Sequence, residues 1–180
     1  MMTAQIANGG YAIKPKIIVD SNPISYEDAK QSMESGLLFD SNSDDLLDKK
    51  LFKDKKNIKI IQEAMFSSTN ERFGTSYKSR IDDPRYQFAG KTGTAQVKRI
   101  SKRERELDLE LEQIPYKDRD HALYVAYGPY INPRYALSII VEHGGSGSKA
   151  AAPIAKKLFK LIIDRHELRN KQSNFERITI

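Results

Sequence analysis

Two stretches near the end of the chain carry the patterns of β-strands. They cover residues 121–127 and 135–142 and are rich in aromatic and β-branched side chains. The residues between them include Gly128, Pro129 and Pro133, which favour turns, so we expect an antiparallel hairpin. A third extended segment around Lys91 should complete one antiparallel sheet.

Apolar residues recur at helical spacing in two further segments, 57–68 and 151–165. Pro153 is tolerated in the first turn of the second helix. We expect both helices to pack on the core. The residues predicted to face inward are Ile58, Ile61, Ala64, Met65, Ile154, Leu158, Leu161 and Ile162.

The remaining segments are less regular. Residues 1–7 are predicted to form a helix that stops at Asn8-Gly9-Gly10. Because this helix has no N-cap and barely two turns, we expect its beginning to lie upstream and the chain to be the later part of a larger domain. Residues 11–19 suggest an edge strand or extended connection, and the polar residues 20–57 suggest short surface helices.

A charged stretch separates the Lys91 segment from the hairpin. Residues 100–120 have Leu107, Leu111 and Ile114 at helical spacing, which predicts an exposed amphipathic helix inserted between strands, with 100–118 as its variable part. Residues 166–180 are expected to form a loose tail. Together these elements predict an α+β domain over residues 1–165, with an antiparallel sheet and flanking helices.

Composition excludes several kinds of chemistry. The chain has no cysteine, which rules out disulfides, thiolate metal sites and a cysteine nucleophile. The three histidines, His121, His143 and His166, lack the close spacing of metal ligands, and we expect no metal and no cofactor. No apolar run in these residues approaches the ~20 needed to cross a bilayer, and the first residues do not have the pattern of a signal peptide.

The net charge of +6 permits binding to an anionic polymer. A small nucleic-acid-binding module is therefore one alternative, with stacking surfaces on Tyr124, Tyr127, Tyr130 and Tyr135. We expect no nucleic-acid partner, because the charges are dispersed and no glycine loop has the spacing of a phosphate cradle.

The most informative residues lie in the run from Phe88 to Val97. In a strand Thr92 and Thr94 point to the same side, and Gly93 leaves bare backbone between them. With the Lys91 ammonium they supply donors for an anionic peptide terminus, while the strand edge pairs with the peptide backbone. A strand-docking module without catalysis is a second alternative.

The Lys-Thr-Gly triplet is a known signature of penicillin-interacting serine enzymes. The triplet follows a helix that ends in Gly-Gly, and it precedes Arg119-Asp120-His121-Ala122 of the hairpin and Val141-Glu142-His143-Gly144-Gly145. This order of motifs resembles the class B penicillin-binding proteins. Gly74-Thr75-Ser76 is similar to a Gly-Thr-Ala that this family carries before its strand motif. The resemblance implies part of a transpeptidase domain of the serine β-lactamase-like fold, from an enzyme of cell-wall cross-linking and cell elongation.

In that family a serine of an S-x-x-K motif attacks the D-alanyl-D-alanine carbonyl of a peptide stem, and an S-x-N motif assists proton transfer. The resemblance implies that Lys91 positions and polarises the serine machinery and that Thr92 and Thr94 hold the substrate carboxylate. It implies that the Thr94 N–H is an oxyanion donor and that Gly93, Ala95 and Gln96 continue the substrate-binding strand.

The resemblance also implies partners and a location. The partners are peptidoglycan stem peptides, β-lactams, the N-terminal half of the domain, a glycan polymerase and elongation-complex proteins. The implied location of the complete enzyme is the periplasmic face of the bacterial inner membrane.

One feature departs from the family pattern. No S-x-x-K motif precedes Lys91 in these residues. We interpret two literal matches, Ser146 to Lys149 for S-x-x-K and Ser68 to Asn70 for S-x-N, as chance. The hypothesis is that this chain carries the substrate-binding strand without the nucleophile and is inactive by itself.

Overall fold

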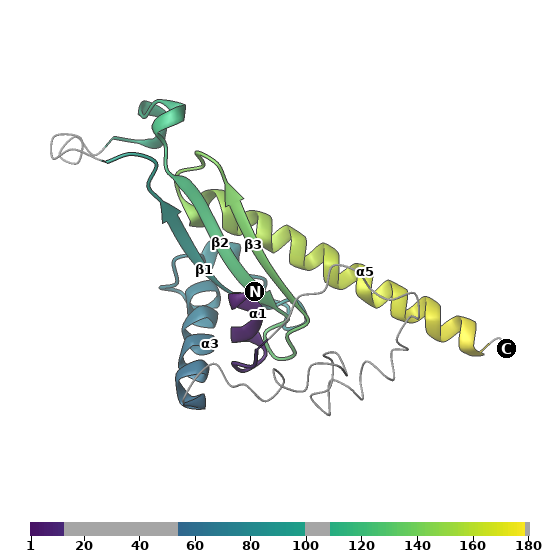
Figure 1. Cartoon of the computed structure of the whole chain (residues 1–180). Helices are drawn as coiled ribbons and strands as arrows, with labels where there is room; N and C mark the ends of the chain where they lie inside the picture. Colours follow the sequence, from purple (N-terminus) through teal and green to yellow (C-terminus); the bar gives the residue numbers. More distant parts are fainter. Residues whose placement is uncertain (13–53, 100–108, 179–180) are drawn as a thin grey trace. The chain divides into compact units, whose positions relative to one another are not determined.

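The computed structural model describes residues 1–12, 54–99 and 109–178, with side chains as far as residue 169 (Figure 1). Contacts divide the chain into two units, Met1–Gln62 and Glu63–Ile180. The expectations for most of 20–57, for most of 11–19 and for Leu107 therefore lie outside the described residues. In the part that is described, no helix has the length and apolar character needed to span a membrane.

The first unit contains the short helix α1, Met2–Ala7, and the first turns of α3, Lys55–Asn70. The predicted stop of α1 is confirmed, because Gly9 and Gly10 adopt φ of 88° and 94° and the Gly10 N–H donates to the Gln5 carbonyl at 2.8 Å. The Gln62 side-chain amide donates to the carbonyl of Ile6 at 2.7 Å. This bond ties the end of α1 to α3 within the unit.

The second unit is built on the predicted three-stranded antiparallel sheet. Its strands are β1 (Ala89–Ala95), β2 (His121–Gly128) and β3 (Tyr135–Val141), with β2 in the centre. In the β1 to β2 register, Thr92 lies opposite Tyr124 and Lys91 opposite Val125. One face of β1 therefore carries Thr92 and Thr94, and the other carries Lys91.

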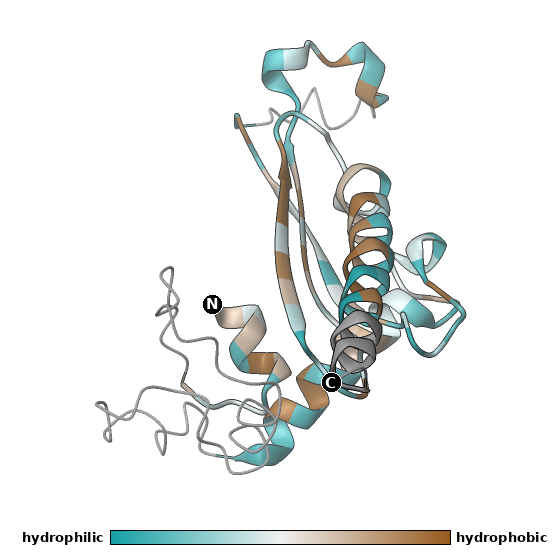
Figure 2. Ribbon diagram, turned by 90° about the vertical axis from the view of Figure 1, so that its right-hand side faces the viewer, coloured by the Kyte–Doolittle hydropathy of each residue, from teal (hydrophilic) through white to brown (hydrophobic). Residues whose placement is uncertain are grey.

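Helix α5, Ala152–Ile178, covers one face of this sheet (Figure 2). The core between them is formed by Phe88, Tyr124 and Phe159, and the stacked rings of Phe88 and Phe159 have centroids 4.9 Å apart. Ala152 and Ala155 are fully buried against the sheet. Small side chains at these positions let the helix backbone approach the strands closely.

The inward face of α5 differs from the prediction. Ile154 and Leu161 are 40% and 56% exposed, and Leu158 and Ile162 are half-buried, whereas Ala151, Ala152, Ala155, Phe159 and Ile163 form the buried stripe. The face of α3 was predicted more closely, since Ile58 and Met65 are buried, Ile61 is half-buried and only Ala64 is exposed.

Two other predictions are wrong where the structure describes them. Residues 109–120 form two short 3-10 turns, η2 (Leu111–Gln113) and η3 (Tyr116–Asp118), in place of a continuous helix. The cause is Pro115, which disfavours helical backbone at Ile114; that residue is extended, with ψ of 127°. The chain after His166 is helical as far as Ile178, where a loose tail was expected.

Candidate functional site

Strand β1 forms one edge of the described sheet, and its polar side chains are accessible there. Lys91 and Thr94 are exposed, and Thr92 and Gly93 are half-buried. The Lys91 ammonium donates to the Thr92 carbonyl at 2.9 Å and lies 3.4 Å from the Thr92 hydroxyl. Although Lys91 starts on the other face of the sheet, its charge therefore reaches the edge beside Thr92. Gln96 follows the end of β1 and is exposed.

A chain of hydroxyl groups continues from this edge. Thr75 Oγ1 lies 3.3 Å from Thr92 Oγ1 and 3.2 Å from Ser68 Oγ. The turn that carries Thr75 closes over the end of α3, where the Ser76 N–H donates to the Ser68 carbonyl at 3.0 Å. Gly74 is required in this turn, because a Cβ there would lie 2.3 Å from the Ser68 carbonyl oxygen.

A buried hydroxyl cluster lies beneath β1. The Tyr124 hydroxyl is 2.9 Å from Thr69 Oγ1 and 3.1 Å from Ser76 Oγ. Burial raises the pKa of Tyr124 despite the opposing effect of these two hydrogen bonds. A Cβ on Gly90 would approach the Tyr124 hydroxyl to 2.3 Å, so glycine is needed for the strand to lie over this cluster.

Gly147 and Gly93 together set how closely the start of α5 packs beneath β1. Gly147 belongs to η4, Gly147–Ala151, the single π-type turn that leads into α5. A Cβ on Gly147 would lie 2.4 Å from the Leu123 carbonyl oxygen and 2.7 Å from that of Gly93. Backbone therefore packs directly on backbone below the centre of β1, with Thr92 and Thr94 on either side of Gly93.

The two literal motif matches have other contacts in the structure. Ser146 Oγ pairs with Ser148 Oγ at 3.0 Å, and Ser146 is the residue before η4. The Asn70 amide donates to the Phe88 carbonyl at 2.9 Å, which fixes the end of α3 to the residue before β1. Ser68 alone of these residues joins the hydroxyl chain described above.

The histidines and tyrosines lie mostly in packing positions. The backbone N–H of His143 donates to His121 Nδ1 at 3.0 Å, and the His166 ring nitrogen Nε2 is 2.8 Å from the Arg134 guanidinium. No group of three potential metal ligands occurs among the residues that the structure describes. Tyr124 and Tyr127 are buried.

The remaining hairpin tyrosines are also engaged. Tyr130 packs on Phe66 with ring centroids 4.3 Å apart, and the Tyr135 ring lies 6.0 Å from that of His166. Both tyrosines are half-buried in these contacts.

Sequence reasoning identified the strand but not its support. The hydroxyl of Tyr124 and the role of Gly147 were missed, since both depend on contacts between distant segments. The sequence marks Thr75 only as part of the Gly74-Thr75-Ser76 triplet and does not predict its contact with Thr92. The sequence shows glycines at 74, 90 and 147, but only the structure shows that each lies at a close approach.

Comparison with known proteins identifies the family of this chain. The model of the penicillin binding protein transpeptidase domain matches residues 1–160, and the chain belongs to this family. Peptidoglycan D,D-transpeptidase MrdA from Salmonella typhimurium is 36% identical over 105 residues, which are 58% of this chain and 16% of that protein. MrdA from Acinetobacter baumannii is 28% identical over 157 residues, or 86% of this chain and 20% of that protein.

Solved structures give the same family. The crystal structure of Pseudomonas aeruginosa PBP2 in complex with WCK 5153 matches with a TM-score of 0.59 and 29% identity, over 89% of this chain and 28% of that one. PBPA from Mycobacterium tuberculosis shares the fold, with a TM-score of 0.52 at 22% identity over 88% of this chain and 32% of that one. The predicted α+β fold and family are confirmed, and the chain is similar to penicillin-binding protein 2.

Proposed function

We propose that β1 binds the C-terminal carboxylate of a peptidoglycan stem peptide in a D,D-transpeptidase site. Thr92 and Thr94 donate hydroxyl hydrogen bonds to the carboxylate, and Lys91 supplies the positive charge. The observation that carries this proposal is the open edge of β1, where the Lys91 ammonium lies 3.4 Å from the Thr92 hydroxyl. Gly93, Ala95 and Gln96 leave room for the main chain of the peptide along this edge.

In the reaction of this family, a serine hydroxyl attacks the D-alanyl-D-alanine carbonyl and forms an acyl-enzyme. The Thr94 N–H would then donate to the developing oxyanion, an interaction worth ~3 kcal/mol in comparable enzymes. Lys91 acts on the serine machinery through its charge. β-Lactams would occupy the same strand.

We assign the attacking serine to residues outside these 180. Ser146 of the one S-x-x-K match is hydrogen-bonded to Ser148, precedes the η4 turn and lies C-terminal to Lys91 in the sequence. The chain spans 16% and 20% of the two curated relatives described above. The remaining domain half, the glycan polymerase, the elongation-complex partners and the periplasmic location belong to the proposal for the complete enzyme.

A labelling experiment tests the assignment of the serine. The purified 180-residue chain is incubated with a fluorescent penicillin and examined on a denaturing gel. We expect no covalent label, because the attacking serine is assigned to residues outside this chain. Labelling that disappears in Ser146→Ala would overturn this part of the proposal.

A binding experiment tests the role of the strand. A fluorescent peptide that ends in D-alanyl-D-alanine is titrated with the chain, and anisotropy gives the Kd. Replacing Lys91 by Ala removes a charge-assisted contact and should weaken binding about tenfold. Lys117→Ala is the matched control, since this lysine is exposed in η3. Equal Kd values for the two variants would sink the proposal; a strand-docking module without catalysis would give that result.

A further inference from the structure

A basic groove lies beside β1 on the side that α5 covers. Its volume is about 880 Å³. Six cationic side chains line it: Arg72, Lys78, Lys149, Lys156, Lys157 and Lys160. Among the described residues that line the groove, none carries a carboxylate.

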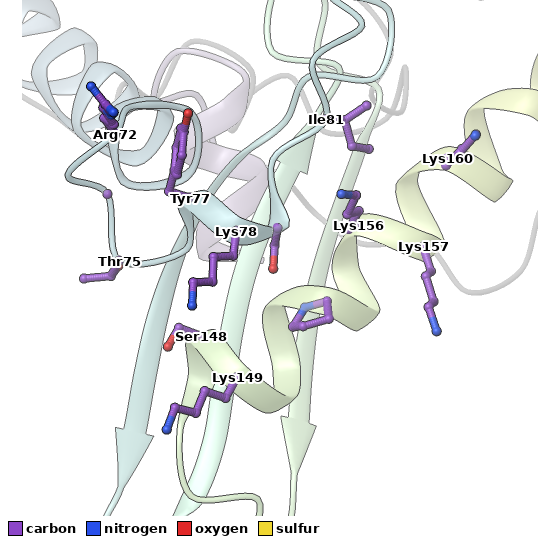
Figure 3. A pocket seen from close by; sticks show the side chains of 13 residues that line it. Arg72, Thr75, Tyr77, Lys78, Ile81, Ser148, Lys149, Lys156, Lys157 and Lys160 are labelled. Carbon is purple, nitrogen blue, oxygen red and sulfur yellow. The ribbon is translucent and has the colours of Figure 1, made fainter.

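The positive charges come from separate parts of the fold. Arg72 follows α3, Lys78 lies in η1 (Tyr77–Ser79), Lys149 lies in η4, and the other three lie in α5. Figure 3 shows Lys78, Ser148 and Lys149 pointing toward the same side of the groove, with Lys156 and Lys160 farther along α5. Such a row of separated charges suits an extended ligand with several anionic groups better than a single phosphate.

Two of these cations, Lys78 and Lys149, lie at the β1 end of the groove and are exposed. In the described structure neither Lys78 nor Lys149 forms an ion pair. Lys160 is different, because it contributes, after the larger effect of Arg85, to lowering the pKa of Asp83. Lys78 and Lys149 therefore bring positive charge without a paired carboxylate to the β1 end of the groove.

The groove is connected to the strand edge through one side chain. Thr75 lines the groove, and its hydroxyl lies 3.3 Å from that of Thr92. A peptide chain paired along β1 would reach this end of the groove. A nucleic acid fits less well, because the Arg80 guanidinium already covers a face of Tyr77, with its carbon 4.0 Å from the ring centroid.

We propose that this groove binds the acidic side chains of a peptide, with Lys78 and Lys149 as the main contacts. The link to a peptide held on β1 rests on the proposed function; the charge recognition in the groove does not. Lysine ammonium groups act as mobile point charges, which matches side-chain carboxylates at variable spacing.

The test is a titration of the full chain with a fluorescent oligo-glutamate peptide whose C-terminus is amidated. This probe has no terminal carboxylate, so its binding does not depend on the terminal-carboxylate contact of the proposed function. A double variant, Lys78→Gln with Lys149→Gln, should weaken binding about tenfold, and the loss should shrink in high salt. The charge-conserving double variant, Lys78→Arg with Lys149→Arg, should retain binding. That result would show that substitution at these positions does not itself disrupt the site.

A matched control removes the same charge elsewhere, with Lys56→Gln and Lys117→Gln, and should stay within about twofold of the unmodified chain. The proposal is overturned if the groove variant binds as tightly as this control, or if an oligo-glutamine peptide binds equally well. Tighter binding of single-stranded RNA that depends on Lys78 and Lys149 would also overturn it. If the oligo-glutamate peptide binds as expected but the D-alanyl-D-alanine peptide does not, the proposed function is contradicted and the proposal for the groove still holds.

Discussion

Two buried tyrosines of β2 have opposite hydrogen-bonding states. Tyr124 is bonded to Thr69 and Ser76 beneath β1. Tyr127 is equally buried, but its hydroxyl has no partner among the described residues. The same substitution at these two sites therefore separates hydrogen bonding from burial.

Replacing Tyr124 by Phe should lower the free energy of unfolding by about 1–2 kcal/mol, because two buried hydroxyls lose their shared partner. Tyr127→Phe should be neutral or stabilising, since it removes an unsatisfied polar group. Urea denaturation of both variants measures the difference. Equal destabilisation of the two would show that the hydroxyl cluster does not support β1.

The same tyrosines predict loss of stability in alkali. Burial raises the pKa of Tyr124 and of Tyr127 above the ordinary tyrosine value of 10.0. Above about pH 10 the unfolded chain loses these protons while the folded chain keeps them, so stability falls as pH rises. Below that pH both states are protonated, and these groups contribute no pH dependence.

Urea midpoints at about pH 8 and about pH 10.5 should reveal the fall. Tyr127→Phe should reduce it, whereas Tyr116→Phe should not, because Tyr116 is 63% exposed. If the urea midpoint of the Tyr127 variant fell by as much between the two pH values as that of the unmodified chain, the argument from burial would be contradicted.

Among the elements, α5 is held by small side chains. Ala155 is fully buried against the sheet. A Cβ on Gly128 would lie only 3.0 Å from atoms of Phe88 and Phe159, so the packing there is equally close. Ala155→Leu should cost about 1–3 kcal/mol by forcing the helix off the strands. Leu161→Ala, on the exposed side, should change stability by less than about 0.5 kcal/mol. Thermal unfolding of the two variants checks this, and an Ala155→Leu variant as stable as the unmodified chain would refute close packing of α5.

The sequence predicted the elements whose signal is local. The β-branched and aromatic content of the hairpin and the Asn8-Gly9-Gly10 stop were sufficient. The face of α5 was misjudged because hydrophobicity favours isoleucine and leucine, whereas close approach favours alanine. The 3-10 turns at 111–118 were not predicted because Leu107, Leu111 and Ile114 recur at helical spacing, whereas Pro115 disfavours helical backbone at the residue before it.

The candidate site was predicted in part for a similar reason. Strand alternation placed Thr92 and Thr94 on one face without knowledge of the fold. The return of the Lys91 ammonium to the edge, the Thr75 bridge and the basic groove depend on tertiary contacts that periodicity does not encode. The family resemblance supplied roles that the geometry of this chain alone does not assign.

At the scale of the whole molecule, β1 connects three features of the second unit. Its open edge carries Lys91 and the two threonines, its underside rests on the Tyr124 hydroxyl cluster and Gly147, and its Thr75 contact leads to the basic groove. The first unit contributes none of these residues. The proposed peptide binding is therefore a property of the second unit.

The most direct measurement is an amide NMR titration of the chain with two peptides that differ only in a free or an amidated C-terminal D-alanine. The account predicts shifts at residues 91–96 with the free carboxylate, and their loss with the amide or in Lys91→Ala. Equal shifts with both peptides, or shifts confined to residues away from β1, would contradict it.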